Sequence, residues 1–428
     1  MKLLKIKEKL EKKQIKKRII RKEFQNKSRK QDSKLTIIGI TGSRGKSTTA
    51  LMIHNYLKYI GYKSTLYSSV MVDSPASYLK KNEAYGADYL VLEVNESTLE
   101  KGFLKDVPFD VRVLTNLNSK HNLEQYTEEE YVELKKSFFR NIDDECKCVF
   151  GFQDYSKELL EELLQLNNYP KYICSSNYIA TLKGVNKEQI TCLLTGLDSE
   201  ISGMKLQFKL NDEVFNLNTN LMMSYNALNV LTAITTLEAL SVFNNTKFEE
   251  ALNNLVIPGR AEVFKEKGKI IIVDAHLPAM LECLKTLKEQ GKVNKIKIVI
   301  GSMGHGYKHW EERFKTEEFA SQRKEVRKYA MNLLKGVADY VYLTESDSGK
   351  ENPLEICKEL ESYLDVKTPS TIIVDREEAI KQAIYDSKEG DVVFISGRGN
   401  RRVLCNSENT MKLLKDSDVV KQALEQLK

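Results

Sequence analysis

Short apolar runs alternate with longer segments of helical spacing along most of the chain. From residue 35 onward, buried strands are predicted by the runs LTIIGI, YLVLEV, VRVLTN and KCVFGF. Residues 46–61, KSTTALMIHNYLKYIG, instead carry apolar positions at helical spacing and end at a glycine. This alternation is typical of a mostly parallel sheet covered by helices, so we predict an α/β fold.

Two α/β domains are predicted, because the pattern changes and then begins again. Residues 186–218 contain short alternating runs that indicate an antiparallel hairpin or small sheet. The segment 256–264, VIPGRAEVF, contains proline and glycine and indicates a hinge. Beyond it, KIIIVDAH starts a second series of strands and helices. We predict a basic arm or helix at 1–34, a P-loop central domain with a mostly parallel sheet at 35–257, and a C-terminal Rossmann-like α/β domain at 258–428.

Composition narrows the class of protein. The chain has 428 residues, of which 41% are hydrophobic and 29% are charged, as in an ordinary globular protein. No apolar run approaches the roughly 18 residues needed to cross a bilayer, and no signal peptide is indicated. Seven cysteines are scattered without a C-x-x-C pair, which favours reduced thiols over a disulfide framework or a zinc site. We therefore predict a cytoplasmic protein.

Positive charge is concentrated at the N-terminus. Residues 1–34 contain 15 Lys and Arg but 4 Asp and Glu, whereas the rest of the chain is slightly acidic. Leu3, Ile6 and Leu10 begin a nearly helical apolar spacing among the lysines, as in a basic amphipathic helix. Such an arm either contacts an acidic partner or the surface of an anionic membrane, or is solvated and docks nowhere. No nucleic-acid-binding module is recognised, so no nucleic acid partner is expected.

Candidate chemistry begins with GITGSRGKSTT, residues 39–49. Lys46 and Ser47 match the end of the phosphate-binding pattern G-x-x-x-x-G-K-[ST], although Ile40 stands where that pattern has its first glycine. The loop follows a predicted strand and opens a predicted helix, the context in which backbone N–H groups bind phosphates. We predict ATP and Mg²⁺ as ligands, with Lys46 on the phosphates and Ser47 on the metal; a purely structural loop is the alternative. The predicted phosphate-binding residues are Gly42, Ser43, Arg44, Gly45, Lys46, Ser47 and Thr48.

Polar residues beyond two later strands add to this predicted site. Glu93 ends the strand YLVLEV, and its carboxylate is a candidate magnesium ligand beside the phosphates. His121 lies just beyond the strand VRVLTN and is a further candidate for the site. The alternatives are a solvated strand end for Glu93 and a hydrogen-bonded structural role for His121. Open α/β sheets bind ligands at the edge where such strands end, which favours the functional interpretation.

Seven motifs resemble those of the Mur ligase superfamily in their order and approximate spacing. They are TGSRGKSTT, LEVNES, TNLNSKH, YNALN, PGRAEVF, VDAHLP and ISGRGN, and the resemblance covers residues 35 to about 405. The phosphate loop of that family is T-G-x-x-G-K-[ST]-T, which has no glycine at the position of Ile40. The chain resembles the tripeptide-forming members most closely, and folylpolyglutamate and poly-γ-glutamate synthases are further relatives.

The resemblance implies an ATP-dependent carboxylate–amine ligase that acts on a small-molecule acid and an amino acid. An acyl phosphate would be captured by an amine, releasing ADP and phosphate. The implied catalytic residues are Lys46, His121 and Lys135, the last of which matches a lysine that is often carbamylated in the family. The implied metal ligands are Ser47, Glu93, His121 and Lys135. The implied nucleotide contacts from later segments are Asn226 at the adenine, Arg260, Asp274 and His276.

Several segments depart from the family pattern. Lys120 precedes His121 where the family has aspartate, VDAHLP lacks the family's tyrosine, and GRGNR (397–401) replaces Gly-Lys-Gly-His-Glu. ESDSGKENP (345–353) replaces Asp-Asn-Pro-Arg, so diaminopimelate recognition is not expected. Only 34 residues precede the first predicted strand, so we expect the UDP-binding N-terminal domain to be absent. These departures keep open a second interpretation, a nucleotide-binding partner or regulatory subunit with little turnover.

Overall fold

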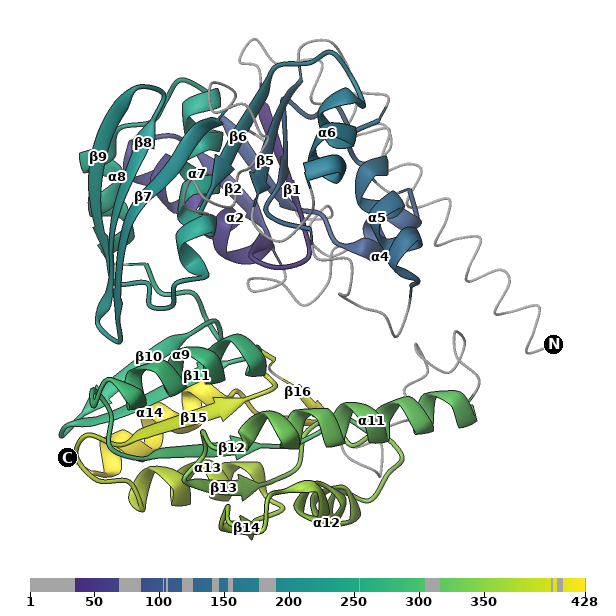
Figure 1. Ribbon diagram of the computed structural model, residues 1–428, viewed down its shortest axis with the longest axis vertical. Helices are drawn as coiled ribbons and strands as arrows, with labels where there is room; N and C mark the ends of the chain where they lie inside the picture. Colours follow the sequence, from purple (N-terminus) through teal and green to yellow (C-terminus); the bar gives the residue numbers. More distant parts are fainter. Residues whose placement is uncertain are drawn as a thin grey trace. The chain divides into compact units, whose positions relative to one another are not determined.

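The chain forms two compact units that divide between Leu255 and Val256, each with its own sheet (Figure 1). The predicted basic arm at 1–34 and the candidate His121 lie outside the residues that the structure describes. This computed structural model describes residues 35–68, 86–102, 104, 107–117, 126–140, 146–152, 157–176, 190–253, 255–304, 316–401, 403–405 and 411–427.

The described part of the first unit forms a nine-stranded sheet in the order β2-β3-β1-β4-β5-β6-β7-β8-β9. Neighbouring strands from β2 to β7 run parallel, which confirms the mostly parallel α/β fold. The predicted antiparallel segment contains β7, β8 and β9, which pair antiparallel with one another, and β7 joins them to the same sheet through its parallel pairing with β6. The strands are β1 (Thr36–Thr41), β2 (Ser64–Tyr67), β3 (Tyr89–Glu93), β4 (Val111–Leu114), β5 (Lys147–Phe152), β6 (Lys171–Ser175), β7 (Ile190–Glu200), β8 (Gly203–Leu210) and β9 (Glu213–Thr219).

The helix α7 is buried along almost its whole length and packs against α2, β5, β6 and β7. Three of its threonines, at 232, 235 and 236, donate their hydroxyls to carbonyl oxygens four residues earlier, which satisfies these buried polar groups. The helix therefore gives a firmly packed support to the start of α2. The helices of this unit are α2 (Lys46–Tyr59), α4 (Glu96–Glu100), α5 (Glu128–Ser137), α6 (Lys157–Gln165), α7 (Asn226–Ala239) and α8 (Asn245–Asn253).

The strand β1 lies where the connections of the sheet change direction. The chain passes from β1 to β2 and β3 on one side, and then crosses to β4 on the other side. Open α/β sheets bind ligands beyond the carboxyl ends of the strands at such a point. β1, β3 and β4 end at Thr41, Glu93 and Leu114, so the phosphate loop and the residues that follow β3 and β4 share this edge.

The described part of the second unit contains a six-stranded sheet in the order β10-β11-β15-β12-β13-β14, in which only β10 is antiparallel. β10 overlaps the segment 256–264, so the last three of the nine residues of the expected hinge belong to a strand paired with β11. The strands are β10 (Glu262–Glu266), β11 (Lys269–Asp274), β12 (Ile296–Ile300), β13 (Tyr340–Leu343), β14 (Ser370–Ile372) and β15 (Val392–Ser396), and a separate hairpin contains β16 (Val403–Cys405) and β17 (Met411–Leu413).

The helices of the second unit are amphipathic and cover its sheet. In the hydrophobic cluster, Ile380 of α13 and Val420 of α14 are buried with Ile395 of β15. Among the described residues, no helix is both long and apolar enough to pass through a bilayer. The helices are α9 (Leu277–Glu289), α11 (Thr316–Leu334), α12 (Pro353–Tyr363), α13 (Arg376–Tyr385) and α14 (Asp416–Gln426).

Candidate nucleotide-binding site

Two glycines shape the loop between β1 and α2. Gly42 has φ +148°, and a Cβ at this position would lie 2.1 Å from Thr115 Oγ1. Gly45 has φ +78°, and its Cβ would lie 1.9 Å from Asn229 Oδ1. Both positions therefore disfavour any larger side chain, because the loop packs closely against Thr115 and Asn229.

The residues after β4 hold this loop in place. Asn116 accepts hydrogen bonds from two loop amides, with its backbone oxygen 3.1 Å from Ser43 N and its Oδ1 3.0 Å from Arg44 N. The Thr115 hydroxyl and the Asn116 amide both donate to the carbonyl oxygen of Arg44. The shape of the phosphate loop thus depends on a second strand end, which lies more than 70 positions later in the sequence.

Lys46 is the first residue of α2, and the N-terminal N–H groups and dipole of a helix favour an anion. Its Nζ donates to the carbonyl oxygens of Gly42 at 2.7 Å and Ser43 at 3.3 Å. These are neutral acceptors of the loop itself, so the amine already lies beside the backbone that would surround a phosphate. Residues 42–48, which are the predicted phosphate-binding residues, therefore lie together at the N-terminus of α2.

Ser47 and Glu93 come together as the metal prediction requires. The Ser47 hydroxyl donates to Glu93 Oε2 at 2.9 Å, and Ser68 donates to the same oxygen at 2.7 Å. One hydroxyl and one carboxylate are hard oxygen donors, and Mg²⁺ is usually held by one or two carboxylates together with phosphate oxygens. The donor set of the described residues therefore fits a magnesium ion beside the loop. His121, the third predicted ligand, lies outside the described residues.

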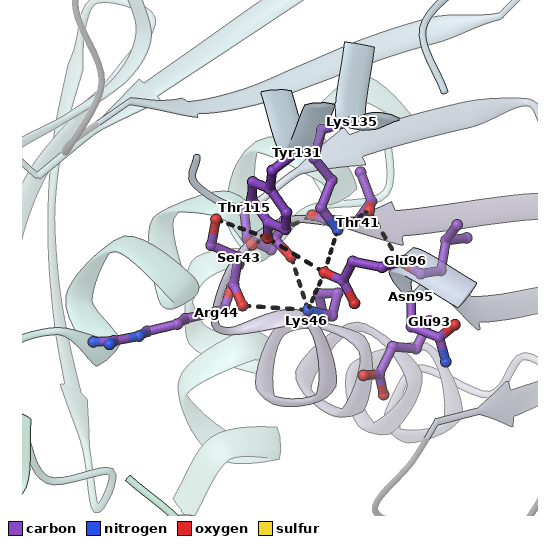
Figure 2. A network of polar contacts seen from close by, with 12 residues as sticks. Thr41, Ser43, Arg44, Lys46, Glu93, Asn95, Glu96, Thr115, Tyr131 and Lys135 are labelled. Carbon is purple, nitrogen blue, oxygen red and sulfur yellow. Dashed lines mark hydrogen bonds and ion pairs between the residues drawn. The ribbon is translucent and has the colours of Figure 1, made fainter. Parts of the chain in front are cut away.

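Lys135 projects from α5 into the same site and is fully buried. Its Nζ donates to Glu96 Oε1 at 2.7 Å and to Thr41 Oγ1 at 3.1 Å (Figure 2). Burial, together with the nearby charge of Lys46, lowers the pKa of Lys135 to about 7. Resemblance to the family selected this residue, and the structure places it beside the phosphate loop.

Glu96 lies at the centre of these contacts, although sequence reasoning did not select it. Figure 2 shows the amines of Lys46 and Lys135 directed at its carboxylate, and Tyr131 Oη lies 3.3 Å from Glu96 Oε1. Burial alone would raise the pKa of Glu96, but the charges of Lys46 and Lys135 lower it to about 2. The carboxylate is therefore ionised throughout the neutral pH range.

Two sequence signals could have indicated that Glu96 and Lys135 belong to the site. Asn95 accepts a hydrogen bond from Thr98 N at 2.9 Å and thereby caps α4, so N-x-x-T in LEVNEST marked a helix that begins at Glu96. Tyr131 and Lys135 are four positions apart on α5 and therefore share one helix face. Both signals are local, but neither shows that the two helices meet.

Asn226 occupies the first position of α7 and is buried. Its side-chain amide donates to the Met222 carbonyl at 2.7 Å, and its oxygen accepts from Asn229 Nδ2 at 2.9 Å. Asn229 in turn lies against Gly45. Asn226 is thus connected to the phosphate loop through one side chain, and its contact with adenine stays a prediction.

Three predicted residues of the second unit lie around the end of β11. The Asp274 carboxylate accepts hydrogen bonds from Ala261 N at 2.9 Å and from His276 N at 2.7 Å. Arg260 belongs to the turn that this carboxylate holds, and its Nη1 lies 3.3 Å from the Gly259 carbonyl. Asp274 therefore fixes the turn before β10 relative to the start of α9. The nucleotide contacts proposed for Arg260, Asp274 and His276 stay predictions.

The GRGNR segment forms an ion-pair network with Asp347 in the second unit. Arg398 Nη1 lies 2.7 Å from Asp347 Oδ1, and Arg401 Nη1 lies 2.7 Å from Asp347 Oδ2. Arg398 is buried, whereas the Arg401 side chain is about half exposed. Asp347 comes from ESDSGKENP, so two segments that depart from the family pattern are paired with each other. Sequence reasoning noted both departures but did not identify Asp347 as their link.

Sequence comparison gives this arrangement a family context. The family model described as Mur ligase middle domain matches residues 40–237, and that described as Mur ligase, glutamate ligase domain matches residues 259–399. The chain is 28% identical over 391 residues to the UDP-N-acetylmuramoyl-L-alanyl-D-glutamate–2,6-diaminopimelate ligase of Geobacillus thermodenitrificans. That match covers 86% of this chain and 74% of the relative.

Solved structures have the same fold. The MurF ligase from Thermotoga maritima in complex with ADP superposes with a TM-score of 0.64 at 20% identity, covering 96% of this chain and 84% of that chain. Folylpolyglutamate synthase from Thermotoga maritima superposes with a TM-score of 0.61 at 16% identity, covering 89% of each chain. Because the two matched domains account for most of both units, the chain belongs to the Mur ligase family.

Proposed function

We propose that this protein is an ATP-dependent ligase that joins a substrate carboxylate to the amine of an amino acid. The observation that carries the proposal is the meeting of Lys46, Ser47 and Glu93 at a glycine cradle in a chain of this family. The matched relatives are named as ligases, which disfavours the second interpretation of a nucleotide-binding subunit with little turnover. The substrate carboxylate attacks the γ-phosphate of ATP, and the amine then displaces phosphate from the acyl phosphate.

The described residues supply the parts that phosphoryl transfer needs. Backbone N–H groups at the start of α2 and the Lys46 amine are donors for the oxygens of the β- and γ-phosphates. Ser47 and Glu93 would hold Mg²⁺, which when bound offsets the charge that develops on the transferred group. Thr115 and Asn116 keep the loop backbone in the cradle conformation, so these donors are positioned before the nucleotide arrives.

The remaining assignments are parts of the same proposal and have less support. Asn226 is assigned to the adenine because Asn229 links it to Gly45. Arg260, Asp274 and His276 are assigned to the nucleotide by family resemblance, and the hydrogen bonds of Asp274 hold their segments together at the end of β11. His121 and Lys135 are assigned as further metal ligands by family resemblance, and Lys135 would need carbamylation to become an anionic ligand.

The cellular location and the partners of the protein are inferred from its proposed substrates and its sequence. The reaction uses ATP and small-molecule acids, and we assign it to the cytoplasm, where ATP is supplied. Residues 1–34 contain 15 basic and 4 acidic residues, and this positive charge supports contact of the arm with an acidic partner or with the surface of a membrane. Binding of the arm to anionic vesicles, compared with neutral vesicles, tests that assignment.

A phosphate-release screen tests the ligase proposal. The protein is incubated with ATP, Mg²⁺, amino acids and candidate acids that include UDP-linked peptides and glutamate polymers, and products are identified by mass spectrometry. We expect one mixture to release phosphate and to yield an amide product. Lys46→Ala should abolish that release, whereas Lys58→Ala, at an exposed position of the same helix, should leave it unchanged. No stimulation by any mixture would instead support the nucleotide-binding subunit.

A further inference from the structure

The side chain of Ser43 connects the phosphate loop to α5. Its Oγ lies 3.1 Å from Tyr131 Oη, and both residues are buried (Figure 2). The contacts that Thr115 and Asn116 make with the loop reach its backbone, whereas this contact reaches a side chain and comes from a separate helix. Two different parts of the fold therefore hold the same loop.

Tyr131 lies near the start of α5, and its position is fixed by the structure around it. Thr127 and Glu130 form a capping box at the beginning of this helix, and Tyr131 N donates to the Thr127 carbonyl oxygen at 3.0 Å. The Tyr131 side chain is fully buried in a hydrophobic cluster of the first unit. Close packing leaves such a ring few alternative rotamers, so its hydroxyl lies at a defined place.

The Tyr131 hydroxyl stays protonated at neutral pH, because burial, followed by the charge of Glu96, raises its pKa well above the usual value. Its single hydrogen has two neighbouring acceptors, Ser43 Oγ at 3.1 Å and Glu96 Oε1 at 3.3 Å. A carboxylate only accepts hydrogen bonds, whereas a serine hydroxyl both accepts and donates. Ser43 can therefore supply the hydrogen of its contact with Tyr131 whenever Tyr131 donates to Glu96, so the contact is kept in either arrangement.

This contact favours the loop conformation that a nucleotide would meet. A loop that is already ordered loses less conformational entropy when a ligand binds. The amides of Ser43 and Arg44 both donate to Asn116, and these two hydrogen bonds depend on the same conformation. One hydrogen bond of ordinary net strength changes such a conformational equilibrium by about twofold to tenfold.

We propose that Tyr131 is a positioning residue of the phosphate loop, whose hydroxyl pre-organises the loop for the nucleotide by holding Ser43. The inference rests on the proposed ATP-dependent function, because the loop is ordered for the phosphates that it would bind. It does not depend on the chemical state of Lys135, since the contact between Tyr131 and Ser43 does not involve that residue.

Amide hydrogen exchange tests the loop in the absence of nucleotide. Tyr131→Phe removes one oxygen and keeps the buried ring, and exchange is followed by NMR. We expect the amides of Ser43 and Arg44 to exchange about twofold to tenfold faster than in the wild type, while the amides between β8 and β9 keep their rates. Unchanged exchange at Ser43 and Arg44 would overturn the proposal. Equal acceleration at both places would also count against it, because it would indicate a general loss of stability.

Binding of a non-hydrolysable ATP analogue with Mg²⁺ tests the link through Ser43. Tyr131→Phe and Ser43→Ala remove the same contact from its two ends, so each should weaken binding by about twofold to tenfold in calorimetric titrations. The double variant should bind within about twofold of Ser43→Ala. Losses that multiply in the double variant would contradict the proposal, because Tyr131 would then act without Ser43.

Tyr59→Phe is the matched control. It removes a 2.8 Å hydrogen bond between an exposed tyrosine and Glu250 at the other end of α2, so both the binding of the analogue and the exchange of the loop amides should stay as in the wild type. A loss equal to that of Tyr131→Phe would refute the role of the contact with Ser43. If the wild type shows no Mg²⁺-dependent binding, the proposed function fails and this inference fails with it. If the wild type binds and Tyr131→Phe binds equally well, only this inference fails.

Discussion

Replacing Gly45 by alanine perturbs the phosphate loop where it meets α7. The φ of Gly45 is +78°, and an added Cβ would lie 1.9 Å from Asn229 Oδ1. A left-handed backbone costs an alanine about 1–2 kcal/mol. Displacing Asn229 also breaks its 2.9 Å hydrogen bond to Asn226 between two buried side chains, which costs about 1–3 kcal/mol. We therefore expect the free energy of unfolding of the first unit to fall by about 2–5 kcal/mol.

Gly61 gives this prediction a matched control at the other end of α2. Its φ is +98°, and beyond its chain neighbours no atom of the described residues lies within 4 Å of the place where a Cβ would be added. Gly61→Ala should therefore cost only the backbone term of about 1–2 kcal/mol and leave nucleotide binding unchanged. Urea unfolding followed by circular dichroism measures the free energy of unfolding, and calorimetric titration with an ATP analogue measures nucleotide binding. Equal losses of stability in both variants, or unimpaired binding by Gly45→Ala, would refute the reasoning about contact with Asn229.

Two further predictions concern buried charges. Burial alone would raise the pKa of Glu96, but Lys46 and Lys135 lower it from 4.5 to about 2. Its stabilising contribution is therefore present above about pH 4.5 and is lost as the pH falls towards 2. The difference in unfolding free energy between the wild type and Glu96→Gln should shrink over that range, and a constant difference would contradict the assignment. Asp416→Asn removes the negative charge that lies 2.8 Å from the fully buried Arg376, so urea unfolding of the second unit should show a loss of about 3–5 kcal/mol. Lys381→Ala is the control, because it removes a partly exposed ion pair with Glu377 and should lower the free energy of unfolding by less than about 1 kcal/mol. Similar losses from Asp416→Asn and Lys381→Ala would argue against burial as the cause.

The strands were the most predictable part of the fold. β1, β3, β4 and β5 lie within one or two residues of the apolar runs that predicted them, because a strand buried on both faces needs an unbroken apolar stretch. The antiparallel strands near residues 190–219 were also predicted. Their membership in the same nine-stranded sheet was not, because a pattern of alternating residues defines the faces of a strand but not its neighbour.

The candidate site was predicted in part. The glycine loop, Lys46, Ser47 and Glu93 were selected because motif spacing and strand ends are visible in the sequence, and Ser47 and Glu93 are in contact. Lys135 was selected only through resemblance to a family. Glu96 was missed because its helix, α4, has five residues and gives no clear apolar periodicity. Asp347 was missed because its partners, Arg398 and Arg401, are more than 50 positions away.

The sequence by itself determined the main strands, the phosphate loop and the family, because apolar runs, glycine spacing and motif order can all be read along the chain. Only the tertiary structure decided which charges meet. Glu96 and Lys135 are 39 positions apart on separate helices, and their 2.7 Å contact exists because α4 and α5 pack at the same edge of the sheet. The charge balance of a buried site is the sum of such long-range contacts, so it is set by packing and not by local pattern.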